Sequence, residues 1–240
     1  MTRAVLLLAL FSLIGCAREP APAWPQGYGY ASYSAWNSDS APPPPRRSQM
    51  VVPRSDAVPV PWTRHHPFGS DLGGGQPCLD WLASYGVPYE ALPPTRGMET
   101  PISVTGPIRG VRYANGTENP MSCDCRLAVA LYYASARFKA LGVHTVRYSG
   151  AYVYRTTRSG RPSLHARGLA IDVHGVSTAN ARYTVKKHFE KELGDGCDTD
   201  APLLNQASCR LRNLGMFKEL ITPDHNADHH DHLHLGLPPN

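Results

Sequence analysis

The stretch from Ser163 to Gly175, SLHARGLAIDVHG, joins a polar turn to an apolar run with strand-like spacing. If the strand covers Leu169 to Val173, successive side chains point to opposite faces of the sheet. One set is apolar and predicts the buried face: Leu169, Ile171 and Val173. The other set faces away from the core: Ala170, Asp172 and His174. His165 lies in the loop before this strand, where Gly168 permits a sharp turn back toward Asp172.

A second stretch, DHNADHHDHLHLG from Asp224 to Gly236, contains five of the eleven histidines of the chain. From His232 to Leu237 the sequence, HLHLGL, alternates with period two, which predicts another strand. The leucines of this strand would face the core: Leu233, Leu235 and Leu237. His232 and His234 would then share the opposite face.

These two strands bring polar side chains together if they lie side by side. His165 and Asp172 would then meet one or both of His232 and His234. Two imidazoles and a carboxylate around one point form a ligand set suited to Zn²⁺, with the fourth position open to water. Such an ion lowers the pKa of its water to about 7 and polarises a substrate carbonyl. We therefore predict a catalytic zinc site with one ion per chain.

This chemistry also requires a base close to the metal. His232 lies on the same predicted strand face as His234, so geometry favours it. Asp231 would point away from an ideal strand, and it reaches the site only if a bulge or the preceding loop turns it inward. Both residues stay candidates for the base.

The surrounding residues predict one compact α+β domain over residues 76–240, in which helices pack on a small antiparallel sheet. Helical periodicity is clearest in MSCDCRLAVALYYASARFKALGV, which Ser122 or Asp124 can cap and Gly142 can end. Three further segments have helical patterns: CLDWLASYGVPY, YTVKKHFEKELG and LLNQASCRLRNLG. Two β-branched and aromatic runs predict strands: HTVRYSGAYVYRTT and LAIDVHGV.

The N-terminal part has a different composition. Residues 1–16, MTRAVLLLALFSLIGC, combine a basic start with an apolar run that is too short to span a bilayer, as in a secretory signal peptide. The end of this segment resembles the lipobox of bacterial lipoproteins, which predicts lipidation of Cys16. The alternative is an ordinary signal peptide with an incidental cysteine. Residues 17–75 are rich in Pro, Gly, Ser and Tyr and predict a disordered tether.

These features predict an exported lipoprotein, held at a membrane by its lipid anchor. In a Gram-negative cell, Ala17 after the cysteine favours the periplasmic face of the outer membrane. Outside the cytosol disulfides are expected, and an odd number of cysteines after Cys16 leaves at least one thiol over. Those cysteines, whose connectivity stays open, are Cys78, Cys123, Cys125, Cys197 and Cys209.

The net charge of +5 is modest and is not concentrated in a basic helix or arm. It permits weak attraction to anionic envelope polymers and gives no indication of nucleic-acid binding.

The motifs together resemble the bacterial extensin-like C-terminal domain family, related to the LAS-type zinc D-Ala-D-Ala peptidases and murein endopeptidases, whose fold hedgehog shares. The family pattern is serine-x-histidine, six residues, aspartate, and a histidine-x-histidine near the end. This chain matches the pattern in order with Ser163, His165, Asp172, His232 and His234. The likeness covers about Cys78 to Leu237 and leaves out the tether.

By position, the resemblance implies that His165, Asp172 and His234 are the zinc ligands and that His232 is the catalytic histidine. Asp231 occupies the place where some relatives use a glutamate as base.

Arg155, in AYVYR, matches the arginine that stabilises the substrate oxyanion in these peptidases. The chain lacks two cysteines that many members carry, one of them at Tyr154, so the family's disulfide pairing is not carried over.

The resemblance implies the LAS/hedgehog-type fold and a zinc-dependent peptidase or amidase that acts on peptidoglycan stem peptides or cross-links, or on another envelope peptide. We expect the chain to be a monomer. Two other functions are compatible with the sequence. A non-catalytic, zinc-containing cell-wall-binding or structural module would keep the ligands without turnover. A metal buffer would bind several ions loosely through His225, His229 and His230.

Overall fold

The computed structural model describes residues 73–117, 119–157, 159–193 and 197–239. The predicted signal peptide with Cys16, and the predicted tether up to residue 72, lie outside the described residues. None of the described helices is long and apolar enough to cross a membrane.

Three helices confirm segments that the sequence predicts to be helical: α1 (Gln76–Ser84), α2 (Cys125–Lys139) and α4 (Leu203–Arg212). Asp124 caps α2, because its side chain accepts a hydrogen bond from the backbone N–H of Arg126. The apolar positions that predict this helix are buried: Leu127, Leu131, Ala134, Phe138 and Leu141. The apolar face predicted from the sequence is therefore the face that α2 buries against the core.

The strands of the described residues form two sheets. The smaller sheet is antiparallel, with the order β1 (Tyr89–Ala91), β2 (Pro101–Val104), β4 (Met121–Asp124). The larger sheet follows the order β3 (Arg112–Ala114), β5 (Val143–Tyr148), β6 (Ala170–Thr178), β9 (Leu233–Gly236), β8 (Glu219–Ile221), and β7 (Arg182–Thr184) also pairs with β6. The β3–β5 pair is parallel, so the predicted α+β class is right but the larger sheet is mixed.

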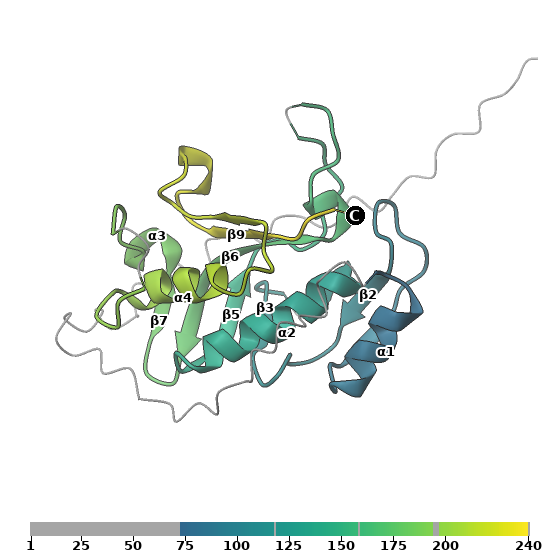
Figure 1. Ribbon diagram of the computed structural model, residues 1–240, viewed down its shortest axis with the longest axis horizontal. Helices are drawn as coiled ribbons and strands as arrows, with labels where there is room; N and C mark the ends of the chain where they lie inside the picture. Colours follow the sequence, from purple (N-terminus) through teal and green to yellow (C-terminus); the bar gives the residue numbers. More distant parts are fainter. Residues whose placement is uncertain (1–72, 118, 158, 194–196, 240) are drawn as a thin grey trace, which may run out of the picture.

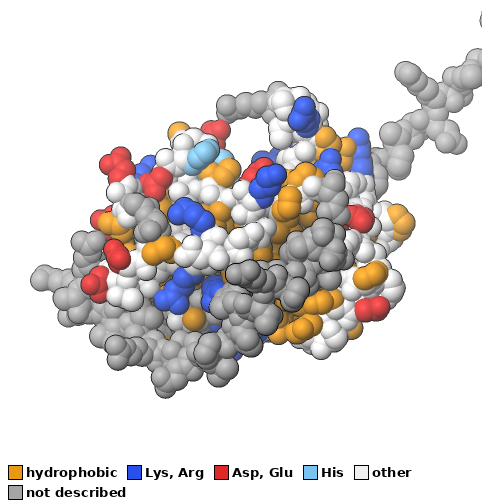
Figure 2. Space-filling model, in the orientation of Figure 1, with side chains coloured by type: hydrophobic (Ala, Val, Ile, Leu, Met, Phe, Trp, Pro, Cys, Tyr) orange, Lys and Arg blue, Asp and Glu red, His pale blue; other side chains and the backbone are white. Residues whose placement is uncertain are grey.

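Helices α2 and α4 lie across one face of the larger sheet (Figure 1). Core side chains from the central strands fill the space beneath them, among them Val146, Ile171, Val173, Leu233 and Leu235. In Figure 2, which views the molecule from the helix side, the Lys and Arg side chains of the described residues are spread over the face rather than gathered in one patch.

Two disulfides among the described residues cross-link the helices to other parts of the domain. Cys78–Cys125 joins α1 to the first residue of α2, and Cys197–Cys209 joins a loop to α4. Among the described cysteines Cys123 is left as a buried free thiol, as the odd number predicts. Burial raises the pKa of this thiol far above its usual range, so it stays protonated.

The helix predicted from YTVKKHFEKELG is wrong over most of its length. The segment pairs as β7 and then makes a single helical turn, α3 (Val185–His188). His188 Nδ1 accepts a hydrogen bond from Thr184 N–H at 2.9 Å, and the side chain of Asn205 binds both the N–H and the carbonyl of Glu190. These side chains occupy backbone groups that a longer helix would need for its own hydrogen bonds.

The strand predicted from HTVRYSGAYVYRTT is correct only over its first five residues, because β5 ends at Tyr148. Ser149 and Gly150 still form backbone hydrogen bonds with Asp172 of β6. The chain then forms a loop that is exposed from Tyr154 onward and is closed by an isolated bridge between Thr156 and Pro162. This loop leads directly into the residues before His165.

Candidate metal centre

Asp172 and His234 lie opposite each other on the neighbouring strands β6 and β9. The residues on either side of them point into the core and are fully buried: Ile171, Val173, Leu233 and Leu235. Because side chains alternate along a strand, Asp172 and His234 project together from the other face of the sheet. The period-two pattern in the sequence predicts this arrangement.

His165 reaches the same point from η3 (His165–Arg167), a single turn that precedes β6. Ser163 supports this turn, because its hydroxyl oxygen accepts a hydrogen bond from Ala166 N–H at 3.2 Å. Gly168 ends it at φ 65°, and its carbonyl accepts from Asp124 N–H at 3.1 Å. A Cβ at Gly168 would lie 2.6 Å from that same nitrogen, so only glycine fits the turn that brings His165 over β6.

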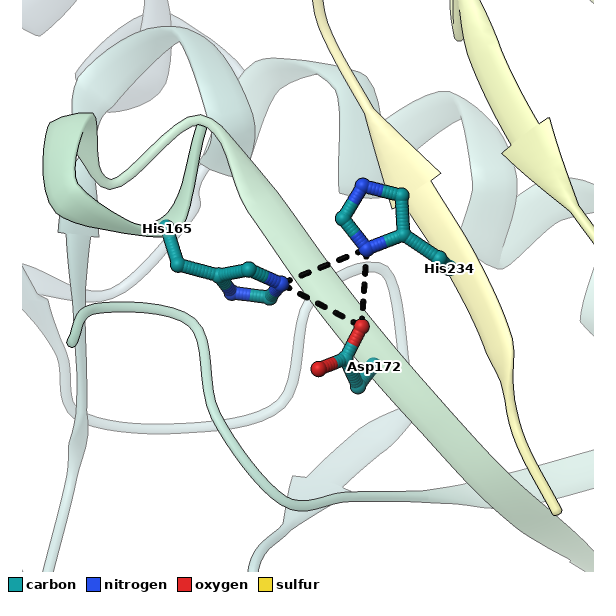
Figure 3. Close-up of side chains that lie close together, drawn as sticks. All are labelled: His165, Asp172 and His234. Atoms are coloured by element: carbon teal, nitrogen blue, oxygen red, sulfur yellow. Dashed lines mark hydrogen bonds and ion pairs between the residues drawn. The ribbon is translucent and has the colours of Figure 1, made fainter. Parts of the chain in front are cut away.

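Three side-chain atoms converge at this point (Figure 3). His165 Nε2 lies 3.2 Å from both His234 Nδ1 and Asp172 Oδ1, and His234 Nδ1 lies 2.8 Å from Asp172 Oδ1. Ligand atoms around a tetrahedral zinc ion with bonds of about 2.0 to 2.2 Å are about 3.3 Å apart. His165 and His234 are only 2% and 8% exposed, so little movement is available to either ring. The spacing and the chemistry of the donors fit a zinc ion.

The carboxyl group of Asp172 is held in its charged form. Burial on its own would raise the pKa of Asp172, but the hydrogen bonds from His165 and His234 and the charges of His165 and His232 outweigh it. The pKa of Asp172 therefore lies well below its usual range, which is the state that a metal ligand requires.

Glu219 supports the group from the adjacent strand β8. Its Oε2 lies 3.5 Å from Nε2 of His234, the nitrogen that faces away from the three converging atoms. A carboxylate on the second ring nitrogen orients a histidine ligand and makes it a better donor. The sequence alone does not point to Glu219, because the three residues of β8 carry too short a pattern to predict a strand.

His232 lies beside the group and just before β9. Its Nδ1 is hydrogen-bonded to Asp231 Oδ1 at 2.8 Å, and its Nε2 lies 3.7 Å from Asp172 Oδ1. Burial would raise the pKa of Asp231, but the hydrogen bond from His232 and the neighbouring histidines lower it. Asp231 therefore turns its carboxylate toward His232, and it is the ring of His232 that faces the three converging atoms.

The structure does not bring every predicted residue to this point. Arg155 is exposed, and among the described residues its side chain forms no hydrogen bond or ion pair with His165, Asp172 or His234. Its backbone carbonyl accepts from Ser163 N–H at 3.0 Å, which places Arg155 next to the entry of η3.

The other three histidines of the tail differ in how close they lie to the candidate centre. The ring centroid of His229, in η4 (Ala227–His229), lies 4.9 Å from that of His232, whereas His225 and His230 are exposed.

Among the comparisons with known proteins, only the family comparison found a match. No curated protein and no solved structure matched the chain. The family model described as extensin-like protein C-terminus matches residues 76–239, which include all of the residues discussed above. The chain therefore belongs to the extensin-like protein C-terminus family.

Proposed function

We propose that this chain is an exported, lipid-anchored zinc peptidase or amidase that acts on the peptide stems or cross-links of peptidoglycan. The observation that carries the proposal is the convergence of His165 Nε2, Asp172 Oδ1 and His234 Nδ1 within 3.2 Å of one another. A histidine–aspartate pair stands beside them, as a hydrolytic centre needs. The likeness of the sequence motifs to LAS-type peptidases supports the same reading.

In this proposal each residue has one role. Zinc held by His165, Asp172 and His234 would act as a Lewis acid on the scissile carbonyl and lower the pKa of a water molecule to about 7. His232 accepts the proton of that water at Nε2 and returns it to the leaving amine. Asp231 binds Nδ1–H of His232 and so keeps Nε2 as the accepting nitrogen.

Arg155 has a separate role in the proposal. Its side chain lies outside the converging group in the structure, so this role requires the exposed segment before η3 to bring the guanidinium to the substrate oxyanion when substrate binds.

The first test is the zinc content of the purified chain, compared with His165→Ala and His232→Ala. We expect one tightly bound zinc per chain, lost in His165→Ala because a ligand is missing and kept in His232→Ala. Several weakly bound ions that do not depend on His165 would support the metal buffer and overturn the proposal.

The second test is the digestion of purified muropeptides by the zinc-loaded chain. Replacing a general base lowers the rate by about 10²- to 10⁴-fold, which is the effect expected for His232→Ala. His230→Ala is the matched control, because His230 is an exposed neighbour in the same tail. Zinc-loaded protein that binds cell walls in a pull-down and leaves muropeptides intact would identify the non-catalytic wall-binding module instead.

A further inference from the structure

A second group of metal-ligating side chains lies next to the first. It consists of His174, Asp231 and His232, and one ligand atom from each lies within 4.8 Å of the others. His174 belongs to β6, two residues after Asp172, and Asp231 and His232 lie in the turn between η4 and β9. All three are half-buried, so they are constrained by the fold and still open to solvent ions.

Both rings of this group turn the same nitrogen toward Asp231. His232 Nδ1 lies 2.8 Å from Asp231 Oδ1, and His174 Nδ1 lies 3.1 Å from the backbone carbonyl of Asp231. His174 is held in this orientation by Ser149, whose hydroxyl lies 2.8 Å from Nε2. His232 Nε2 points the other way, toward Asp172. The ring of His232 therefore stands between two ligand sets and presents one nitrogen to each.

We propose that His174, Asp231 and His232 form a second, weaker zinc site whose occupation inhibits the first. The second set is less buried than the first, since all three of its residues are half-buried whereas His165 and His234 are 2% and 8% exposed. Before zinc can bind, Asp231 must give up its hydrogen bond to His232, and His174 Nδ1 must leave the backbone carbonyl of Asp231. We expect binding to be weaker than at the first set, whose atoms stand 2.8 to 3.2 Å apart.

Inhibition follows from the chemistry of imidazole, and this step rests on the proposed function. A neutral imidazole that binds a metal through Nδ1 carries its proton on Nε2. His232 would then have no lone pair at Nε2 with which to accept a proton from water, and Asp231 would no longer orient it. Excess zinc thus blocks the base while the first site stays filled.

The test measures zinc binding to the purified full chain by equilibrium dialysis, without reference to activity. We expect two equivalents, the second bound roughly tenfold or more weakly than the first. His174→Ala should lose the second equivalent and keep the first, and the retained first equivalent shows that the variant is folded. Asp231→Ala is an independent second variant with the same expectation. The double variant His225→Ala/His230→Ala is the matched control, because it removes two exposed histidines of the same tail and should keep both equivalents.

Three binding results would overturn the site: a single equivalent in the wild type at every zinc concentration, a second equivalent that survives in both His174→Ala and Asp231→Ala, or its loss in the tail control. An activity arm then tests regulation. Excess zinc should inhibit muropeptide cleavage by the wild type and not by His174→Ala; equal inhibition of both would overturn the inhibitory role. If the wild type cleaves nothing, the proposed function fails, and the binding arm still decides the second site.

Discussion

Glu219 contacts the candidate metal centre through His234 and is not itself one of the three converging residues. Its carboxylate lies 3.5 Å from His234 Nε2, and the side chain is half exposed. We therefore expect its effect on zinc affinity to be small for a carboxylate that contacts a histidine ligand. We expect Glu219→Gln to weaken zinc binding by about tenfold, because the amide orients the ring without the negative charge. Competition with a chelator measures the change.

The control for Glu219 is Glu90→Gln, an exposed carboxylate of β1 in the other sheet. Equal zinc affinities in the two variants would show that Glu219 plays no part in metal binding.

His174 gives the metal-free protein a measurable pH dependence. Burial lowers the pKa of His174 from 6.5 to about 4, although the charge of Asp231 opposes the shift. Above pH 6.5 the ring is neutral in both the folded and the unfolded chain, so it does not alter the free energy of unfolding. Between pH 6.5 and pH 4 the unfolded chain binds a proton that the folded chain does not. Over this window the free energy of unfolding falls as pH is lowered, by at most about 1.4 kcal/mol per pH unit.

Urea unfolding in the presence of a chelator tests this expectation. The wild type should lose more stability than His174→Gln between pH 6.5 and pH 4.5, because glutamine has no titrating group. Parallel stability profiles for the two proteins would contradict the assignment of a neutral, half-buried His174.

At the scale of single residues, the sequence predicts that His165, Asp172 and His234 meet. It does not predict the contacts of the residues around them. Period two on both strands places Asp172 and His234 on one face, and Gly168 predicts the turn that returns His165 to them. The pairing of Asp231 with His232 and His174 depends on how the tail turns before β9. Neither strand pattern contains that information. The catalytic and metal-binding roles themselves stay predictions.

The turn at η3 is the element that completes the centre, and Gly168 is its most constrained residue. Gly168 and Gly142 both have positive φ, 65° and 73°, so alanine is strained at either position. Only at Gly168 would the added methyl meet backbone, since nothing lies within 4 Å of a Cβ at Gly142. We expect Gly142→Ala to cost about 1 to 2 kcal/mol and to leave zinc affinity unchanged.

Gly168→Ala should cost more than Gly142→Ala and also weaken zinc binding, because relief of the clash moves His165 away from Asp172. Denaturant unfolding and zinc titration of both variants make the comparison. Equal effects of the two substitutions would show that the turn is not fixed against the start of α2.

Among the elements, long amphipathic helices are predicted from the sequence and short strands are not. α1, α2 and α4 carry buried stripes that local periodicity reveals. The strands β1, β2 and β4 contain only three or four residues each, and long-range pairing defines them. For the same reason the local pattern predicts a helix from Tyr183 onward, because it does not reveal the pairing of Tyr183 with Val176 of β6 or the contacts of Glu190 with Asn205.

At the scale of the whole molecule, the candidate centre joins parts of the chain that are far apart in sequence. His165 and His234 are separated by 69 positions, and the strand that carries His234 is the last described element. An ion bound by both residues and Asp172 would hold η3, β6 and β9 together. The proposed metal would therefore contribute to folding as well as to chemistry.

This linkage predicts that zinc raises the thermal stability of the purified chain. A ligand that binds only the folded state at 100 times its Kd adds about 2.7 kcal/mol to the free energy of unfolding. For a domain of this size that corresponds to a rise in Tm of roughly 5 to 11 °C. His165→Ala should show no such rise at the same zinc concentration, whereas His144→Ala, which removes an exposed histidine of β5, should rise with the wild type. Differential scanning calorimetry distinguishes these outcomes. A rise of the same size in His165→Ala would place the stabilising zinc elsewhere in the molecule, because the folded state would then gain from an ion that this ligand does not hold.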